Sequence, residues 1–464
     1  MRLVALQVSW LTMTVARLGN SMLAVGGTRR LGLGVAVVVA LLSTASSAAA
    51  TVSWSTQYNT GADSISCPDS SDCVAVGGID AYATSNAGAT WTQYSIATSQ
   101  FLGSVSCVSA SRCWAVGTAE AIFATADHGS TWTSQGPPTG VTLGAVSCVA
   151  GSSPGDCWAV GDSGTVLATT NGSTWTPQAS GTVNNLDGIA CPNSSDCWAV
   201  GTGGVAISTT NGGKTWTSES SGTSNDLYSI ACPSSAECFA VGRSGTLIET
   251  TNGGSTWAAK PSGTLDDIGG IACVTTQQCL AIASSETLLT NDGGTSWSAE
   301  GPSANGLGVD SCPAAVGECW VTGPYQGTIL AGLLPPANTG APAISGTALT
   351  SQTLSASTGG WAGVGLSYGY QWEHCDSGGN NCSNVSGATG QAYSLTSSDV
   401  GYTIRVVVTA TNPEGSSSAV SFPTAVVKDP GEGPDTWSSV FSPTTQQLNA
   451  VSCASAGNCV AVGA

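Results

Sequence analysis

The sequence predicts an all-β fold made of short antiparallel strands, and three observations support this prediction. The chain has 464 residues with 61 glycines and 15 tryptophans, a composition typical of many short strands and turns. A sequence motif that contains cysteine and tryptophan recurs along most of the chain, and all 18 cysteines fall into pairs that are close in sequence. Because a single core seldom serves so long a chain, we also expect more than one domain.

The first fifty residues predict a targeting segment rather than part of the fold. Arg29-Arg30 precedes the apolar run 31–42, and small residues follow as far as Ala50, which is the pattern of a secretory signal peptide. A retained transmembrane anchor is the alternative, but it needs about 18 or more apolar residues. We therefore predict that residues 1–50 are removed and that the protein is secreted or attached to the cell surface, without membrane insertion after cleavage.

The remaining chain is strongly acidic. Residues 1–50 hold four of the ten basic residues and none of the 28 acidic ones, so residues 51–464 carry a net charge of −22. Such a surface repels nucleic acid and anionic membranes, and it favours solubility or cationic partners.

The cysteines form nine local pairs with none left over. They are Cys67/Cys73, Cys107/Cys113, Cys148/Cys157, Cys191/Cys197, Cys232/Cys238, Cys273/Cys279, Cys312/Cys319, Cys375/Cys382 and Cys453/Cys459. An even number of regularly spaced cysteines behind a signal peptide predicts disulfides. Zinc is the alternative, but it needs four convergent ligands, usually with histidine, and the chain has only His128 and His374.

The repeat predicts the architecture. The first cysteines of the first seven pairs recur every 39–43 residues, and tryptophans recur in step with them: Trp91, Trp132, Trp175, Trp216, Trp257 and Trp297. In the unit that ends at Trp257, the segments LYSIAC, CFAVG, TLIETT and TWAA are predicted strands separated by turn residues. Four antiparallel strands per repeat predict one blade of a β-propeller, whereas the alternative, a β-helix, has shorter rungs.

We therefore predict a seven-bladed β-propeller over residues 51–334, with a disulfide hairpin in each blade. The seventh unit stops at Pro335-Pro336 without a fourth strand, and the segment TVSWSTQY at 51–58 resembles a fourth strand without its first three. We expect residues 51–58 to complete the seventh blade and so to join the ends of the ring.

The turn before each tryptophan has a pattern of its own. Five segments match S/T-x-D/N-x-G-x-S/T-W, and a sixth, Thr169–Trp175, is one residue short; the five are Thr84–Trp91, Thr125–Trp132, Thr209–Trp216, Thr250–Trp257 and Thr290–Trp297. This pattern resembles the Asp-box repeat of sialidase-like, sortilin-like and photosystem-assembly-factor-like propellers. The resemblance implies that the box is a structural turn, and hence that these residues carry no chemistry.

Two further modules are predicted after the propeller. Residues 335–428 comprise a Pro/Gly/Ala linker and long alternating strands around Trp372, and the segment with Asp399, Gly401 and Tyr402 resembles bacterial immunoglobulin-like repeats. We expect an Ig-like β-sandwich that serves as a spacer. Residues 429–464 return to the propeller pattern after a linker, which predicts a truncated blade at the start of a second propeller array.

The residues needed for several chemistries are missing. A sialidase needs three convergent arginines, but residues 51–464 contain only Arg112, Arg243 and Arg405, and the last lies in the Ig-like module. Two histidines leave little room for a Ser-His-Asp set. The Gly-rich turns lack the Gly-Lys-Ser/Thr of a phosphate loop, so we predict no cofactor.

Carboxylates on one face of the propeller remain as candidate site residues. The connections from strand four to strand one and from strand two to strand three should share one face, which would present Asp162, Asp187, Asp226, Arg243, Asp266 and Asp267. A solvated acidic rim is the simplest interpretation. Paired acids could also hydrolyse a glycoside; the Asp-box propellers that this sequence resembles include xyloglucan-cleaving glycosidases. The same acids could instead hold calcium.

The sequence favours a non-enzymatic binding scaffold, secreted or on the cell surface, that presents this acidic face to a protein or glycan partner. One alternative is a glycoside hydrolase that acts on polysaccharides with paired carboxylates. Another, implied by the resemblance, is a chaperone similar to photosystem assembly factors. The sequence predicts neither the ligand nor an oligomeric state.

Overall fold

The computed structural model describes residues 52–59, 61–136, 140–153, 155–302, 308–313, 317–322, 328–430, 448–455 and 458–463. The predicted signal peptide and most of the predicted linker after residue 429 lie outside the described residues. Within them the chain forms strands and five short 3-10 helices, without an α-helix. Accordingly, no helix in this part of the chain is long and apolar enough to span a bilayer.

Seven four-stranded antiparallel sheets lie between residues 53 and 333 of the described chain, and we number them as blades 1 to 7. Blade 1 contains β2 (Ser64–Ser66), β3 (Cys73–Gly77), β4 (Asp80–Thr84) and β5 (Thr92–Ser95). Blade 2 contains β6 (Leu102–Ser109), β7 (Arg112–Gly117), β8 (Ile122–Thr125) and β9 (Thr133–Ser134). Blade 3 contains β10 (Leu143–Cys148), β11 (Cys157–Gly161), β12 (Val166–Thr169) and β13 (Thr176–Gln178).

The later blades follow the same order of strands. Blade 4 contains β14 (Leu186–Ala190), β15 (Cys197–Gly201), β16 (Ala206–Thr209) and β17 (Thr217–Glu219). Blade 5 contains β18 (Leu227–Ala231), β19 (Cys238–Gly242), β20 (Leu247–Thr250) and β21 (Ala258–Ala259). Blade 6 contains β22 (Ile268–Cys273), β23 (Cys279–Ala283), β24 (Glu286–Thr290) and β25 (Ser298–Pro302). Blade 7 contains β26 (Gly308–Ser311), β27 (Glu318–Thr322), β28 (Thr328–Leu333) and β1 (Ser53–Asn59).

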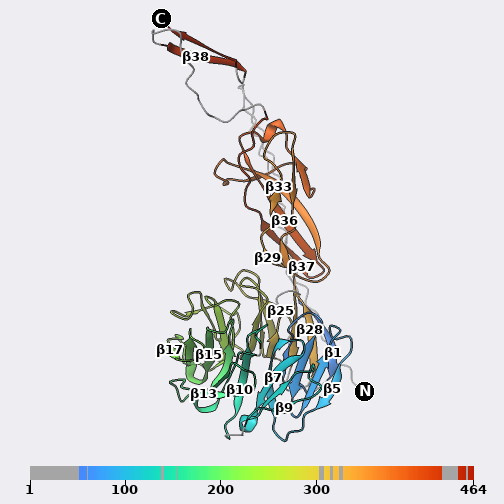
Figure 1. The fold of residues 1–464 in the computed structure, drawn as a ribbon, viewed down its shortest axis with the longest axis vertical. Coiled ribbons are helices and arrows are strands. Elements are labelled where there is room, and N and C mark those ends of the chain that lie inside the picture. Colours follow the sequence, from blue (N-terminus) through green and yellow to red (C-terminus); the bar gives the residue numbers. More distant parts are fainter. Residues whose placement is uncertain are drawn as a thin grey trace, which may run out of the picture. The chain divides into compact units, whose positions relative to one another are not determined.

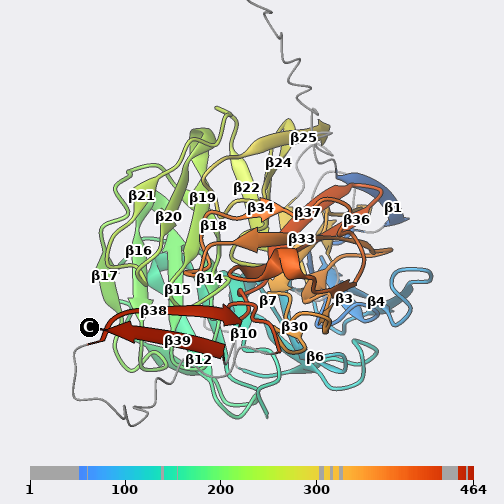
Figure 2. The ribbon, with the colours of Figure 1, turned by 90° about the horizontal axis from the view of Figure 1, so that it is seen from above.

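The sheets form a closed ring. The first strand of each blade contacts the first strand of the next, in the order β2, β6, β10, β14, β18, β22 and β26, and β26 contacts β2. This is the arrangement of a β-propeller. The N-terminal strand β1 pairs antiparallel with β28, with Trp54 opposite Gly332, and the two lie side by side in Figure 1. Residues 53–59 therefore supply the fourth strand of the last sheet, as the sequence predicted; Figure 2 shows the ring from above.

Disulfides close the first hairpin of each blade. In the described residues, eight of the nine predicted pairs are joined, namely all except the last. Cys148 lies directly opposite Cys157 in the β10–β11 pair, with the two Cα atoms 4.1 Å apart. The side chains of Cys453 and Cys459 lie outside the described residues, although the two positions are opposite each other in the pair β38 (Leu448–Ser455) and β39 (Asn458–Gly463).

The second cysteine of each blade hairpin is a core residue and not part of a surface site. In blade 7, Cys319 is bonded to Cys312 and has none of its surface exposed. It belongs to one buried cluster with Leu280 of blade 6 and Val321 of its own strand. The second cysteines of the other blades are at most 1% exposed: Cys73, Cys113, Cys157, Cys197, Cys238 and Cys279. Because packing between blades covers Cys319 and its counterparts, they act as crosslinks and cannot take part in ligand binding at the surface.

The five segments that match the box pattern, and the sixth that is one residue short, fold as tight turns, which we call box turns. In the turn Thr84–Trp91, the Gly88 N–H donates to Thr84 Oγ1 at 3.0 Å, and the Thr90 N–H donates to Asn86 Oδ1 at 2.9 Å. The same two bonds recur in the box turns that begin at Thr125, Thr209, Thr250 and Thr290. The side-chain oxygens thus satisfy backbone donors of the turn, as Asx and ST turns do.

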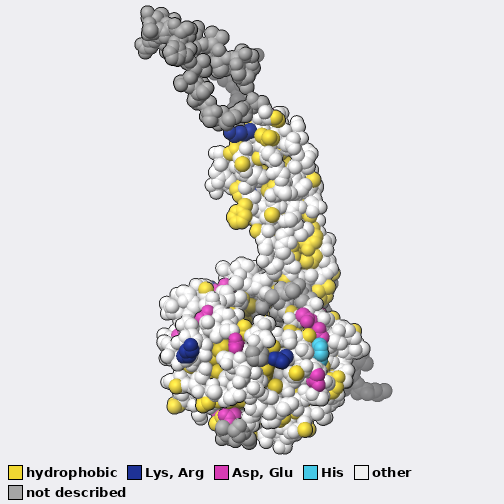
Figure 3. Space-filling view, viewed as in Figure 1, with side chains coloured by type: hydrophobic (Ala, Val, Ile, Leu, Met, Phe, Trp, Pro, Cys, Tyr) yellow, Lys and Arg dark blue, Asp and Glu magenta, His cyan; other side chains and the backbone are white. Residues whose placement is uncertain are grey.

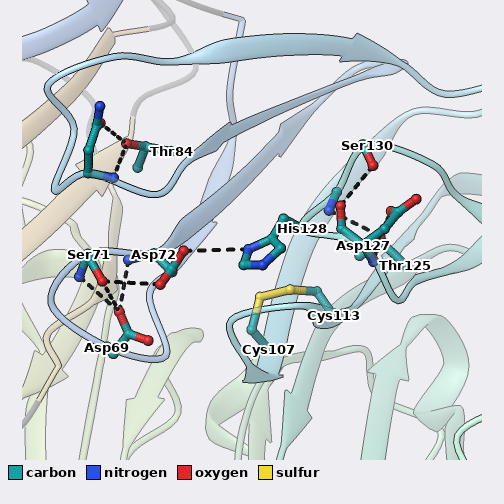
Figure 4. Close-up of polar contacts among 12 residues, drawn as sticks. Asp69, Ser71, Asp72, Thr84, Cys107, Cys113, Thr125, Asp127, His128 and Ser130 are labelled. Carbon is teal, nitrogen blue, oxygen red and sulfur yellow. Dashed lines mark hydrogen bonds and ion pairs between the residues drawn. A yellow bond between two sulfur atoms is a disulfide. The ribbon is translucent and has the colours of Figure 1, made fainter.

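Among the described residues, five of the six box turns, all except the shorter one of blade 3, also bond to the disulfide hairpin of their own blade. The Ala87 N–H donates to the Ser71 carbonyl at 3.0 Å in blade 1, and the Gly212 N–H donates to the Ser195 carbonyl at 2.9 Å in blade 4. Figure 4 shows the Cys107–Cys113 disulfide near the box residue His128, whose Nδ1 lies 3.5 Å from Asp72 Oδ1 of blade 1. We call this end of the blades the hairpin face.

Aromatic side chains of five second strands, those of blades 2, 3, 4, 5 and 7, pack against the following blade. Trp114, Trp158, Trp198, Phe239 and Trp320 are all buried. The box-turn glycine of the following blade lies so close to this ring that a Cβ there would approach it to 2.6 Å for Gly88 and Trp320, and to 2.5 Å for Gly294 and Phe239. A glycine is therefore needed where the ring of one blade packs under the turn of the next, including the contact from blade 7 to blade 1.

Hydrogen bonds from the indole N–H groups of two box tryptophans form a second link between blades. Trp216 Nε1 donates to Gln178 Oε1 at 3.0 Å, and Trp257 Nε1 donates to Glu219 Oε2 at 2.8 Å. In each case the acceptor is the residue three positions after the box tryptophan of the preceding blade. Lys260 occupies this position in blade 5 and cannot accept a hydrogen bond, and Trp297 Nε1 has no partner in the described part of the chain.

The residues after the propeller form a separate core between two sheets. One sheet contains β30 (Ile344–Ser345), β31 (Thr353–Ala356) and β35 (Ala392–Ser394); the other contains β34 (Ser383–Asn384), β33 (Ser367–Cys375), β36 (Thr403–Asn412) and β37 (Gly415–Val420); β29 (Ala337–Gly340) pairs with β32 (Gly360–Ala362). Leu354, Trp372 and Val406 are fully buried in the shared core. The Cys375–Cys382 disulfide closes a local hairpin, as the sequence predicted.

A buried carboxylate fixes one corner of this second unit. Asp399, in the 3-10 helix η5 (Ser397–Asp399), accepts hydrogen bonds from Tyr393 Oη at 2.7 Å and from the Thr396 N–H at 2.6 Å. It also contacts His374 Nε2, whose ring stacks on Tyr402 with centroids 4.6 Å apart. This network accounts for the Asp399, Gly401 and Tyr402 pattern structurally.

Deletion of residues 51–60 tests the role of β1 in the ring. The deletion leaves β28 with an unpaired edge and removes the residues opposite it, so we expect the melting temperature to fall by about 10 °C or more. Differential scanning fluorimetry under non-reducing conditions measures this, with a chain that begins at residue 51 as the control. Equal melting temperatures for the two chains would contradict the closure.

Substitution of Glu219 tests the indole link between blades 4 and 5. Glu219→Ala leaves Trp257 Nε1 without its acceptor, so we expect the free energy of unfolding to fall by about 1–2 kcal/mol. Glu219→Gln should stay within about 0.5 kcal/mol of the wild type, because Gln178 already serves as the acceptor for Trp216. Urea unfolding distinguishes the variants, and an equal loss for both would show that the hydrogen bond is not the cause.

Candidate functional site

The other end of the blades carries the candidate site residues, and we call it the loop face. It consists of the turns between second and third strands and the loops between successive blades. The turns of blades 2 to 5 are the 3-10 helices η1 (Thr118–Glu120), η2 (Asp162–Gly164), η3 (Thr202–Gly204) and η4 (Arg243–Gly245). Backbone hydrogen bonds join the two kinds of connection, for example from the Thr202 N–H to the Asn185 carbonyl at 3.0 Å, so they share one face as predicted.

The loops rest directly on these turns. Ser163 and Gly164 both have positive φ, 55° and 70°, which is the conformation of a type I′ hairpin turn. A Cβ on Gly164 would lie 2.1 Å from the Thr182 carbonyl oxygen of the next loop. The same close approach occurs in blades 4 and 5, so the turn glycine allows the loop to pack against it.

Two of the predicted site residues bridge neighbouring blades. Asp226 Oδ1 accepts a hydrogen bond from the Gly203 N–H at 2.8 Å, and Asp267 Oδ1 accepts one from the Ser244 N–H at 2.7 Å. Asn185 plays the same part for the Ser163 N–H at 3.0 Å. These carboxylates therefore tie the first strand of one blade to the turn of the preceding blade, in addition to any role at the surface.

Arg243 and Asp266 also have partners on the loop face. Arg243 Nη1 lies 3.8 Å from Asp226 Oδ2, and both side chains are partly exposed, so this ion pair contributes at most about 1 kcal/mol. Asp266 accepts a hydrogen bond from Ser285 Oγ. The candidate carboxylates thus differ in how many hydrogen-bond or ion-pair partners they already have within the protein.

Two of these acids, Asp162 and Asp187, have no hydrogen-bond donor to the carboxylate among the described residues, and Asp187 is the one that lies in a strand. It lies at a break in the register of β14, between Leu186 and Gly188, and it is half-buried. Its carboxylate has no hydrogen-bond donor among the described residues. Burial raises its pKa, and the carboxylates of Asp226 and Asp162 raise it further. The structure therefore brings Asp162, Asp187 and Asp226 into one electrostatic cluster.

Tyr228 belongs to this cluster and was not among the predicted site residues. It occupies the position of Asp187 in the next blade, at the register break between Leu227 and Ser229. Burial and the carboxylates of Asp267 and Asp226 raise the pKa of its phenol. The aligned segments LDGIA and LYSIA carried the signal that could have revealed it.

The acids do not converge as metal ligands do. Within the residues that the structure describes, no group of three or more His, Cys, Asp or Glu side chains could hold a metal ion. Charged side chains are also sparse on the surface seen in Figure 3, where they form small separate patches. A cluster of this kind suits a larger cationic group better than a bare ion.

Comparisons with known proteins support the fold. A family model described as the DUF6242 beta propeller domain matches residues 110–235. Among solved structures, the chain is similar to U3-55K (8% identity, 62% of this chain and 100% of that chain, TM-score 0.52). It is also similar to the RRP9 WD40 repeats (8%, 62% and 98%, TM-score 0.51) and to YCF48 from Cyanidioschyzon merolae (16%, 60% and 98%, TM-score 0.49). No curated protein matches.

Asp187→Asn tests the electrostatic strain in the cluster. A carboxyl whose pKa is raised by folding destabilises the folded state once the pH exceeds that pKa, and it has no such effect below the ordinary aspartate pKa. We therefore expect the variant to be more stable than the wild type at pH 7 by a few tenths of a kcal/mol, up to about 1 kcal/mol. The difference should vanish near pH 3.5. Urea unfolding at both pH values measures this, and a less stable variant at pH 7 would contradict the analysis.

Proposed function

We propose that the protein is a non-enzymatic binding scaffold, secreted or on the cell surface, that presents the loop face of its propeller to a protein or glycan partner. Asp187 carries this proposal. Its carboxylate is half-buried, lacks a hydrogen-bond donor among the described residues and lies in the field of two other carboxylates. A cationic group from a partner would supply the missing interaction, and perturbed acids of this kind concentrate at functional sites.

The disulfides support the proposed location. Eight hairpins are oxidised, and disulfides persist mainly in extracellular and other oxidising compartments. The signal-like sequence over residues 1–50 points the same way. In this proposal the second unit, residues 335–428, is the predicted Ig-like spacer, and the box turns are the Asp-box turns that the sequence resembles.

Capture from the envelope fraction of the source cells tests the proposal. Residues 51–464 are immobilised as wild type, Asp187→Asn and Glu237→Gln, and bound proteins and glycans are quantified. Loss of one charged contact should weaken capture by Asp187→Asn about fivefold. Glu237 is a matched control, because burial also raises its pKa but it lies on the hairpin face. Equal capture by all three proteins would contradict the role of the loop face.

Asp187 also favours a second candidate, a glycoside hydrolase. An acid with a raised pKa beside ionised carboxylates is the arrangement that general acid catalysis needs. Reducing-sugar release from a panel of plant and microbial glycans tests this activity, with Asp187→Asn, Asp226→Asn and Asp267→Asn as variants. If the wild type releases reducing sugar and Asp187→Asn abolishes this release, the protein is a glycoside hydrolase and not a binding scaffold. The folding of the other two variants must be checked, because Asp226 and Asp267 both bridge blades.

A further inference from the structure

Exposed apolar side chains are confined to the loop face. Among the described residues of the propeller, four large apolar side chains stay exposed: Ile79 (45%), Phe101 (65%), Val183 (83%) and Leu265 (88%). Ile79 lies in the turn between β3 and β4, and the other three lie in loops between blades. The hairpin face shows no such side chain in the described residues, so the distribution differs between the two ends of the ring.

Val183 and Leu265 lie at equivalent positions. Each lies three residues before the buried Leu186 or Ile268 that begins the next first strand, in blades 4 and 6. Ser224 occupies this position in blade 5. An extended segment that follows the order of the blades from Val183 to Leu265 therefore meets a small residue in blade 5, whose first strand holds Tyr228 and directly follows Asp226.

The loops that carry these side chains are fixed in place. Ser262 Oγ, in the loop of Leu265, donates to the Gly245 carbonyl at 2.8 Å, and the Thr264 N–H donates back to Ser262 Oγ at 3.4 Å. In the loop of Val183, Ser180 is likewise buried, and Asn184 Nδ2 donates to the Thr202 carbonyl of the turn η3 at 2.9 Å. The exposure of Val183 and Leu265 thus belongs to anchored loops, and a partner would lose little ordering entropy there.

The charge of this surface selects the occupant. Among the described residues of these loops and turns, five carboxylates (Asp162, Asp187, Asp226, Asp266 and Asp267) outnumber two cations: Arg243, which lies beside Asp226, and Lys260, which pairs with Glu249 of β20. Exposed apolar side chains beside unneutralised carboxylates complement a segment that carries both apolar side chains and a guanidinium or ammonium group. A neutral or acidic glycan would offer no cation to Asp187 and little apolar surface to two separate aliphatic side chains.

We infer that the loop face of blades 4 to 6 docks an extended protein segment in which apolar side chains flank an arginine or lysine. Val183 and Leu265 contact the apolar side chains, and the basic group enters between Asp187 and Asp226, over Tyr228. This inference rests on the proposed function and commits it to a basic, apolar peptide rather than a glycan.

Short synthetic peptides test the inference. The library places an arginine between two leucines at varied spacings, and each peptide has counterparts with Gln for Arg and with Ser for Leu. Fluorescence anisotropy at low and high salt compares the wild type with Asp187→Asn and with the double variant Val183→Ser/Leu265→Ser. Val364→Ser is the control, because Val364 is an exposed valine (42%) of the second unit.

We expect the arginine–leucine peptides to bind the wild type and both kinds of counterpart to bind about tenfold more weakly. The double variant should lose about tenfold in affinity for the parent peptides, and Asp187→Asn should lose affinity for Arg but not for Gln peptides. Val364→Ser should bind like the wild type. Absence of peptide binding, or binding that ignores both variants, would overturn the inference. If peptides do not bind but capture from the envelope fraction still depends on Asp187, the proposed function stands with a different class of partner. If capture does not depend on Asp187 either, the inference and the proposed function both fail.

Discussion

The disulfide between the first two strands is the constraint on which each blade depends. A blade of about forty residues buries too little apolar surface to be stable alone, and a crosslink that closes a short hairpin restricts the unfolded chain at each repeat. The box turn then bonds to the backbone of that same hairpin, as Ala87 does to Ser71. The disulfide and the bond between the box turn and the hairpin both lie within one repeat, so they shape the hairpin face without the help of a neighbouring blade.

Contacts between blades add the second level of order. The ring of a second-strand aromatic side chain packs under the next box turn, and Trp320 makes this contact with Gly88 across the junction of blades 7 and 1. At the other face, Asp226 and Asp267 accept hydrogen bonds from the turns of preceding blades. The hairpin face is held by this packing together with polar links such as that from Trp257 to Glu219. The loop face is held by polar bridges that leave some carboxylates and aliphatic side chains open to solvent.

Much of the fold could be predicted from sequence because its signals are local. The predicted strand CFAVG has the bounds of β19. The pairing of β1 with β28 could be predicted because residues 51–58 resemble the fourth strand of a blade, whereas the seventh unit lacks a fourth strand. The site was harder to predict. Asp226 and Asp267 were expected only as surface acids, because composition does not show which carboxylate meets a backbone donor 23 residues earlier. Tyr228 was missed because a tyrosine in a strand is usually a packing residue, and only its alignment with Asp187 sets it apart.

The account of the fold requires that each blade is closed within its own repeat, and the pairing of the cysteines tests this most directly. Mass spectrometry of proteolytic peptides from the non-reduced protein identifies each disulfide. The account predicts that every cysteine in residues 51–334 is bonded to its partner within the same repeat. Disulfides that join different repeats, or free thiols in the purified non-reduced protein, would contradict it.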